Sequence, residues 1–80
     1  MSRRADAPAQ ARLQSLLRKI RIEAGLRQSD LADRIGQPQS FVSKYESGER
    51  RLDLIELHAI CRATGVPLEA FVRRFEGGPD

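Results

Sequence analysis

A glycine between two short helical patterns constrains this chain more than any other feature of its sequence. Apolar residues recur at helical spacing on both sides of Gly36: Leu31, Ala32, Ile35, Val42 and Tyr45. Glycine readily adopts the left-handed conformation that ends one helix and redirects the chain. We therefore predict two helices between residues 28 and 48, joined at an angle across Gly36.

The second of these helices should carry a face free of aliphatic side chains. Hydroxyl groups and one cation occupy this face at i, i+3, i+4 and i+7: Ser40, Ser43, Lys44 and Ser47. Short polar side chains let a helix approach another surface closely and hydrogen-bond to it. The sequence thus predicts a binding face on this helix, which Pro38 should open at the first helical position.

Three more helices follow from apolar periodicity elsewhere in the chain. The first should begin at Pro8 and end at Gly25, with an apolar face of Leu13, Leu16, Leu17, Ile20 and Ala24. The fourth should begin at a capping box of Asp53 and Glu56 and end at Gly65. The fifth should follow Pro67, with apolar positions at Leu68, Phe71, Val72 and Phe75.

We expect an all-α fold of five helices in one domain at residues 8–76. A disordered N-terminal arm (residues 1–7) and a flexible tail (residues 77–80) should flank it. Within the last helix, Leu68 and Val72 should complete the core. Phe71 and Phe75 make this helix more apolar than the terminal helix of a small monomer needs to be, which indicates an interface. The alternative is that both rings cover the first helix of their own chain.

Composition excludes several classes of function. The chain has 80 residues and one cysteine, and no apolar run near the roughly 20 residues that span a membrane. No apolar block follows the first basic pair, so we expect a cytoplasmic protein without a signal peptide. His58 and Cys61 lack the further ligands that a metal site requires, and no nucleophile, base and orienting group can be assembled. We therefore expect neither an enzyme nor a cofactor.

Positive charge is concentrated towards the N-terminus. Residues 1–27 carry seven basic and two acidic residues, a net charge of +5, and the rest carries seven basic and nine acidic residues, a net charge of −2. A basic end on a small protein suits nucleic acid or another acidic surface. A solvated helix face explains the same charges, and composition alone favours this simpler explanation.

The spacing around Gly36 resembles the helix-turn-helix of the phage repressor/Cro (XRE-type) family. The resemblance continues to about Phe75 and rests on these residues: Arg21, Gly25, Gln28, Leu31, Ala32, Gly36, Val42, Ser43, Glu46 and Gly48. It implies a lambda-repressor-like domain whose third helix reads DNA. Arg27 departs from the family, which often has a serine or threonine cap at that position, so Ser29 or Asp30 would have to cap the second helix.

The resemblance also implies roles for individual residues. Gln39, Ser40 and Lys44 map onto base-reading positions, and glutamine can pair with adenine while lysine can pair with guanine. Phe41 could contact a thymine methyl group or pack beneath the turn. The expected phosphate ligands are Gln28, Ser43, Arg50 and Arg51. Arg21 and Glu46 should form an ion pair that ties the first helix to the recognition helix.

The implied function is sequence-specific binding of double-stranded DNA by a bacterial or phage transcriptional regulator, with repression as the simpler mode. The family commonly dimerises through its last helix, which places Phe71 and Phe75 at a homodimer interface. Such a homodimer would bind an inverted-repeat operator. The alternative is a protein-interaction module or an antitoxin-like partner that uses the same fold.

Overall fold

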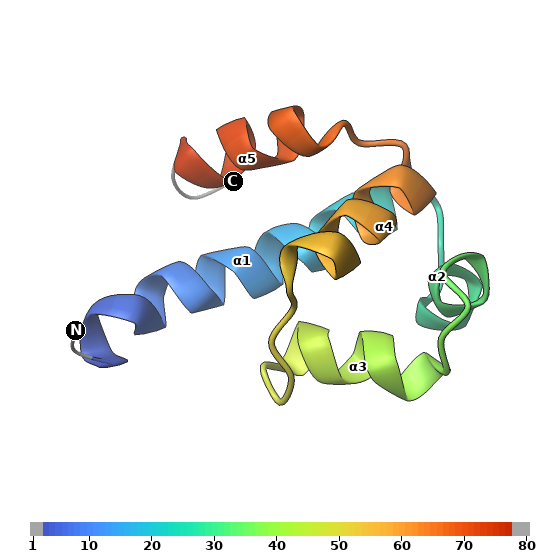
Figure 1. Ribbon diagram of the computed structural model, residues 1–80, viewed down its shortest axis with the longest axis horizontal. Helices are drawn as coiled ribbons and strands as arrows, with labels where there is room; N and C mark the ends of the chain where they lie inside the picture. The colour runs from blue at the N-terminus through green and yellow to red at the C-terminus, as the bar shows by residue number, and fades with distance from the viewer. Residues whose placement is uncertain (1–2, 78–80) are drawn as a thin grey trace.

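The structure is a computed structural model that describes the backbone of residues 3–77 and the side chains of residues 7–77. These residues form five helices and no strand, as the sequence predicts (Figure 1). The helices are α1 (Arg3–Glu23), α2 (Gln28–Arg34), α3 (Gln39–Ser47), α4 (Leu54–Thr64) and α5 (Leu68–Glu76). The long α1 lies between α3 on one side and α5 on the other, and contacts both (Figure 1).

The start of α1 differs from the prediction. The helix begins at Arg3, so Pro8 lies inside it and residues 3–7 are helical instead of forming a disordered arm. Proline removes one backbone hydrogen bond from a helix. Alanines at positions 5, 7, 9 and 11 surround it, and alanine has the highest helix propensity. Residues 1–2 of the expected arm and residues 78–80 of the expected tail lie outside the described residues.

Glycines end the helices where the sequence predicts. Gly36 has a φ of 67° and redirects the chain from α2 towards α3. Gly48 ends α3 with a φ of 89°, and a second constraint applies there, because a Cβ atom would lie 2.6 Å from Nε2 of Gln14. The backbone therefore needs glycine at position 48 for both conformation and space.

Side chains make capping contacts at the starts of α4 and α2. At α4, the Asp53 carboxylate accepts from the Glu56 backbone N–H at 2.7 Å and Glu56 accepts from the Asp53 N–H at 2.9 Å, which is the predicted capping box. At α2, Asp30 accepts from the backbone N–H of Arg27 at 2.9 Å, but the Arg27 side chain caps no N–H group of the helix. Pro38 directly precedes α3 instead of forming its first residue.

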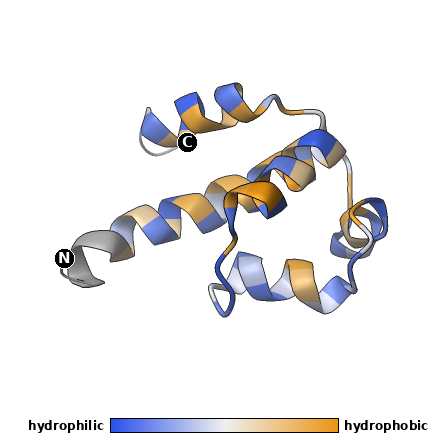
Figure 2. Ribbon diagram, viewed as in Figure 1, coloured by the Kyte–Doolittle hydropathy of each residue, from blue (hydrophilic) through white to orange (hydrophobic). Residues whose placement is uncertain are grey.

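One hydrophobic core joins all five helices. It contains these buried residues: Leu16, Leu17, Ile20, Leu31, Ala32, Phe41, Val42, Tyr45, Ile60, Cys61 and Phe71. Ala32 is 1% exposed, and its small side chain lies in the core that α2 and α3 share. The ribbon of α5 shows its hydrophobic residues on the side that faces α1 (Figure 2).

The rotation of α5 corrects two predictions. Phe71 is 2% exposed and belongs to the core, whereas Val72, predicted to be in the core, is 41% exposed. Phe75 is half-buried, and the Arg12 guanidinium from α1 lies 4.7 Å from the centre of its ring. The two rings therefore cover the chain's own α1, because they offer more apolar area for burial than one valine does.

Candidate functional site

The exposed face of α3 carries the residues predicted to read bases. Gln39, Ser40 and Lys44 are all exposed, and Ser43 beside them is half-buried. The opposite face of α3 is buried through Val42 and Tyr45. The helix is thus anchored in the core on one side and open to a binding partner on the other.

Phe41 does not belong to this open face. It is 8% exposed, and its ring meets that of Tyr45 edge-on with the ring centroids 5.6 Å apart. The structure thus selects packing over base contact for Phe41, because a buried ring is not available to a thymine methyl group. We correct the predicted base-reading role of Phe41 accordingly.

Arg21 and Glu46 form the ion pair expected from the resemblance. Arg21 Nε lies 2.7 Å from Glu46 Oε2, and Arg21 Nη2 lies 3.0 Å from Oε1, so the contact is bidentate. The two side chains are 11% and 5% exposed. Arg21 also donates to the carbonyl of Leu26, and the hydrogen bond to Glu46 is the main reason that the pKa of Arg21 is raised. A bidentate contact at this burial fixes the rotation of α3 relative to α1.

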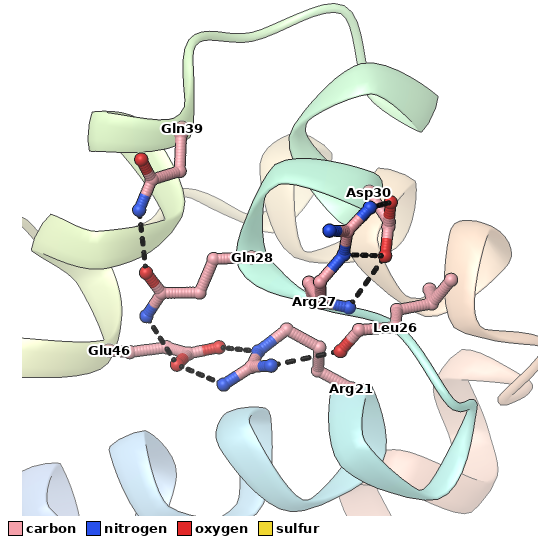
Figure 3. Close-up of polar contacts among 7 residues, drawn as sticks. All are labelled: Arg21, Leu26, Arg27, Gln28, Asp30, Gln39 and Glu46. Carbon is pink, nitrogen blue, oxygen red and sulfur yellow. Dashed lines mark hydrogen bonds and ion pairs between the residues drawn. The ribbon is translucent and has the colours of Figure 1, made fainter.

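Two glutamines extend this ion pair outwards to the exposed face of α3 (Figure 3). Gln28, the first residue of α2, donates from Nε2 to Glu46 Oε1 at 3.1 Å. Gln39, the first residue of α3, donates from Nε2 to Gln28 Oε1 at 2.9 Å. The side chain of Gln28, predicted to bind phosphate, is therefore engaged by protein groups at both ends. No spacing pattern in the sequence predicted the contact between Gln28 and Gln39.

Arg50 is engaged as well. Its guanidinium pairs with Glu56 at 2.7 Å, lies 4.6 Å from the centre of the Phe41 ring and donates to the carbonyl of Arg51. The hydrogen bond from Arg50 is the largest cause that lowers the pKa of Glu56, followed by the Asp53 backbone N–H. Arg50 thus holds the loop after α3 to the start of α4. Arg51 is exposed.

His58 and Cys61 both lie on α4, one at the surface and the other in the core. His58 is exposed and Cys61 is 0% exposed, and burial raises the pKa of the Cys61 thiol to about 11. A buried thiol with a high pKa remains protonated and unreactive at neutral pH. Within residues 3–77, no group of three or more histidine, cysteine and acidic residues could hold a metal ion.

An apolar patch that was not predicted lies at the start of α4, where the ribbon is strongly hydrophobic (Figure 2). Leu54 and Ile55 are 67% and 80% exposed. Beside them lies a hollow of about 190 Å³, lined by Ile35, Gln37, Phe41, Ile55, Glu56 and Ala59. The sequence did carry a signal for this patch. Leu54 and Ile55 directly follow the N-cap residue Asp53, and a helix start that faces solvent is usually polar.

The chain matches known proteins over most of its length. A helix-turn-helix family model matches residues 17–71. An XRE-family-like protein from Pseudomonas syringae pv. tomato is 46% identical, with a TM-score of 0.81 over 91% of this chain and 88% of that one. The restriction-modification controller protein C.Esp1396I is 25% identical, with a TM-score of 0.80 over 86% and 90%. A comparison with curated protein sequences finds no match.

The fold and the exposed polar face of α3 thus define a helix-turn-helix protein. The chain belongs to the XRE-type helix-turn-helix family. The clp gene regulator ClgR from Corynebacterium glutamicum has the same fold at 22% identity, with a TM-score of 0.77 over 86% of this chain and 73% of that one. Membership in the XRE family supports a DNA-binding transcriptional regulator. A membrane-spanning segment would need a longer apolar run than any helix within residues 3–77 provides.

Proposed function

We propose that this protein is a sequence-specific regulator that binds double-stranded DNA as a homodimer and represses transcription by steric block. The observation that carries the proposal is the position of Gln39, Ser40 and Lys44. All three are exposed on one helix, and a buried bidentate ion pair at Glu46 fixes the rotation of that helix. A rigid, polar, convex helix of this kind fits the major groove of B-DNA.

Base readout would come from two kinds of side chain on α3. Gln39 offers one donor and one acceptor, which match N7 and N6 of adenine, and Lys44 can donate to N7 and O6 of guanine. Ser40 can contact several base edges. These contacts would distinguish one operator from another, because the major groove presents a different pattern for each base pair.

Phosphate contacts would come from the edges of this face. Ser43 is half-buried beside the base readers, and Arg51 is exposed in the loop that follows α3. Arg50 would act through the loop that it holds to Glu56. A dimer that neutralises about 6–10 phosphates should lose roughly 10³–10⁵-fold in affinity between about 50 and 200 mM salt.

The patch of Leu54 and Ile55 is the surface on which a second copy would dock. Phe71 is buried and Phe75 is covered by Arg12, so neither ring offers the exposed apolar surface that a dimer contact at α5 would use. Ile55 is 80% exposed and borders a hollow of about 190 Å³. In a two-fold dimer, each Ile55 would enter the hollow of the other copy. The hollow includes Gln37 and Phe41, so this contact would flank the start of the recognition helix.

Selection of bound sequences from random duplex DNA tests the function. We expect two inverted half-sites whose centres lie about 34 Å apart, one helical turn. Lys44→Ala should relax base choice at one position of each half-site at a cost of roughly 1–3 kcal/mol, whereas Arg51→Ala should weaken all duplexes alike. Weak, salt-insensitive binding to every duplex would overturn the proposal and favour a protein-interaction module.

The dimer is tested separately by the mass of the protein in solution. Ile55→Glu should convert a dimer into a folded monomer, because the changed side chain is exposed in the single chain and buried only against a second copy. Val72→Glu is the matched control, since Val72 is also exposed but lies on α5. A dimer that survives Ile55→Glu and dissociates with Val72→Glu would contradict the proposed interface and place it at α5.

A further inference from the structure

Helix α4 presents a face that is exposed from its first turn to its last. Ile55, Ala59 and Arg62 follow one another at helical spacing, which places them on one side of the helix, and all three are exposed. Ala59 lines the hollow beside Ile55 and also a larger neighbouring hollow of about 450 Å³. The surface on which a second copy would dock therefore continues along α4 beyond its apolar end.

The larger hollow has cationic but no acidic residues in its lining, which consists of Arg34, Ile35, Ala59, Arg62 and Ala63. Arg34 donates from Nη1 to the carbonyl oxygen of Ala63 at 2.9 Å, which holds the guanidinium at the hollow. Asp30 interacts with Arg34 electrostatically, but its carboxylate is hydrogen-bonded to Arg27. In the part of the chain whose side chains the structure describes, neither Arg34 nor Arg62 forms an ion pair. The hollow therefore suits a carboxylate, which arginine binds through strong charge-assisted hydrogen bonds.

Asp53, directly before the apolar patch of Leu54 and Ile55, carries a carboxylate of this kind. It is exposed, and its Oδ1 atom accepts from the backbone N–H of Glu56 at 2.7 Å. Its other oxygen accepts no hydrogen bond from any residue between 7 and 77. Arg50 attracts Asp53 electrostatically, but its guanidinium is hydrogen-bonded to Glu56. One carboxylate oxygen of Asp53 is thus left for a second copy of the chain.

Two-fold symmetry would bring this carboxylate to the larger hollow of the other copy. When a two-fold axis crosses α4 at a right angle, the two copies of the helix run antiparallel, so the start of one lies beside the end of the other. Ile55 of the second copy would enter the hollow between Ile55 and Ala59. Asp53 of the second copy would then lie about level with Ala59, and Arg62 follows about 4.5 Å further along the helix. An arginine side chain is long enough to close that distance.

We propose that Asp53 of each copy forms an ion pair with Arg62 of the other, beside the guanidinium of Arg34. This inference rests on the homodimer of the proposed function and identifies the polar half of its interface. The two pairs would also select the orientation of the dimer. In a parallel arrangement each Asp53 would face Asp53 and each Arg62 would face Arg62, and like charges across an interface oppose association. The same residues would attract a second copy in one orientation and repel it in the other.

A double-mutant cycle on the dissociation constant of the dimer, measured by sedimentation equilibrium at low salt, tests this ion pair. Asp53→Asn removes one charge and retains a cap for α4, since asparagine is as good an N-cap as aspartate. Arg62→Gln removes the other charge at an exposed position. Arg18→Gln changes an exposed arginine of α1 in the same way and serves as the matched control.

Each single variant should weaken the dimer by about two- to thirtyfold, because two partly exposed ion pairs are lost per dimer. The double variant should lie within about twofold of the weaker single variant, because the second change removes a residue whose partner is already gone. Arg62→Glu should weaken the dimer more than Arg62→Gln, since it places a carboxylate against Asp53. Arg18→Gln should leave the dissociation constant unchanged.

Losses that add in the double variant would overturn the ion pair, because the two residues would then act independently. Equal dissociation constants for Arg62→Gln, Arg62→Glu and the unchanged protein would overturn it as well, and neither variant alters the cap of α4. If Ile55→Glu dissociates the dimer in either case, the proposed homodimer stands while the ion pair fails. A chain that stays monomeric at every concentration, with or without selected DNA, overturns the homodimer and the ion pair together.

Discussion

Helices α3 and α5 are each nine residues long and pack on opposite sides of α1, but the ion pairs that orient them differ in burial (Figure 1). On α5, Phe71 enters the core, Arg12 donates to the carbonyl of Phe75, and Arg74 pairs with Glu23 through side chains that are 30% and 48% exposed. On α3, an apolar side also enters the core, and the ion pair of Arg21 with Glu46 joins side chains that are 11% and 5% exposed. Solvent weakens an exposed ion pair more than a buried one.

The two helices therefore differ in how firmly they are oriented. Rotation of α5 about its axis would break an ion pair that is largely open to water and contributes little. The same rotation of α3 would break the buried bidentate contact between Arg21 and Glu46 and would move Gln39 away from Gln28. The helix with the open polar face is therefore the one whose rotation is fixed by buried hydrogen bonds.

The largest effect on stability should come from the buried aromatic ring of α5. Phe71→Ala should lower the free energy of unfolding by about 3–5 kcal/mol, because it removes a fully buried ring from the core. Val72→Ala, the matched change on the exposed side of α5, should stay within about 0.5 kcal/mol. Urea unfolding measures both. Equal effects of the two variants would mean that α5 is rotated relative to the structure.

Glu46→Ala should destabilise somewhat less, by about 3 kcal/mol, because it leaves the buried guanidinium of Arg21 without its partner. It should also reduce DNA affinity more than its distance from the bases suggests, since α3 loses its fixed rotation. Glu49→Ala, in the loop after α3, is the control and should change the free energy of unfolding by less than about 0.5 kcal/mol. An unchanged melting temperature and unchanged DNA affinity in Glu46→Ala would contradict the claim that the contacts of Glu46 fix the rotation of α3.

Arg50→Met should have a smaller effect than Glu46→Ala. It removes a pair whose side chains are 39% and 24% exposed, and solvent weakens such a contact. We expect a lower melting temperature and faster backbone hydrogen exchange in residues 48–52, with α5 unaffected. Arg51→Met should leave melting unchanged, weaken binding to all duplexes alike and reduce the salt dependence of that binding. The opposite result would identify Arg50 as a phosphate ligand and Arg51 as the structural residue.

The smallest effect should be a dependence of stability on pH through Glu56. Arg50 lowers the pKa of Glu56 below its ordinary value of 4.5 in the folded protein. The Glu56 carboxylate therefore binds a proton more readily in the unfolded chain than in the folded protein. The stabilisation that ionised Glu56 gives to the folded state is complete above about pH 4.5, and it is lost as the pH falls through the folded pKa. Glu56→Gln should flatten the fall in melting temperature between about pH 5 and pH 3. If melting temperature falls with pH equally steeply in Glu56→Gln and in the unchanged protein, Glu56 is not the source of this pH dependence.

Local sequence signals predicted the helices well where the cause was local. The glycines at 36 and 48 and the capping box at Asp53 act within a few residues, and each lies where the sequence placed it. The predicted start of α1 was wrong. The preference of proline for the first helical position was given more weight than the helix propensity of the alanines around Pro8. The exposed positions of Ser40 and Lys44 followed from helical periodicity, and that of Gln39 followed from the resemblance to the family.

Contacts between helices were harder to predict. Phe41 and Phe71 could each have faced outwards by periodicity, and only packing against residues distant in the chain placed them in the core. Arg50 is beside Glu56 in space because of the path of a loop, and Gln28 meets Gln39 because α2 packs against α3. Such contacts depend on the angle between helices, which a single sequence does not encode in any short pattern.

Local patterns in the sequence predict an all-helical domain with two helices joined at a glycine and a polar face on the second, because turn chemistry and periodicity are local properties. Only the packing of the helices against one another settles which aromatic rings are buried, which arginines are engaged and how Gln28 links Glu46 to Gln39. Those outcomes depend on the competition of side chains for the same buried volume and the same hydrogen-bond partners, and that competition exists only once the helices have packed.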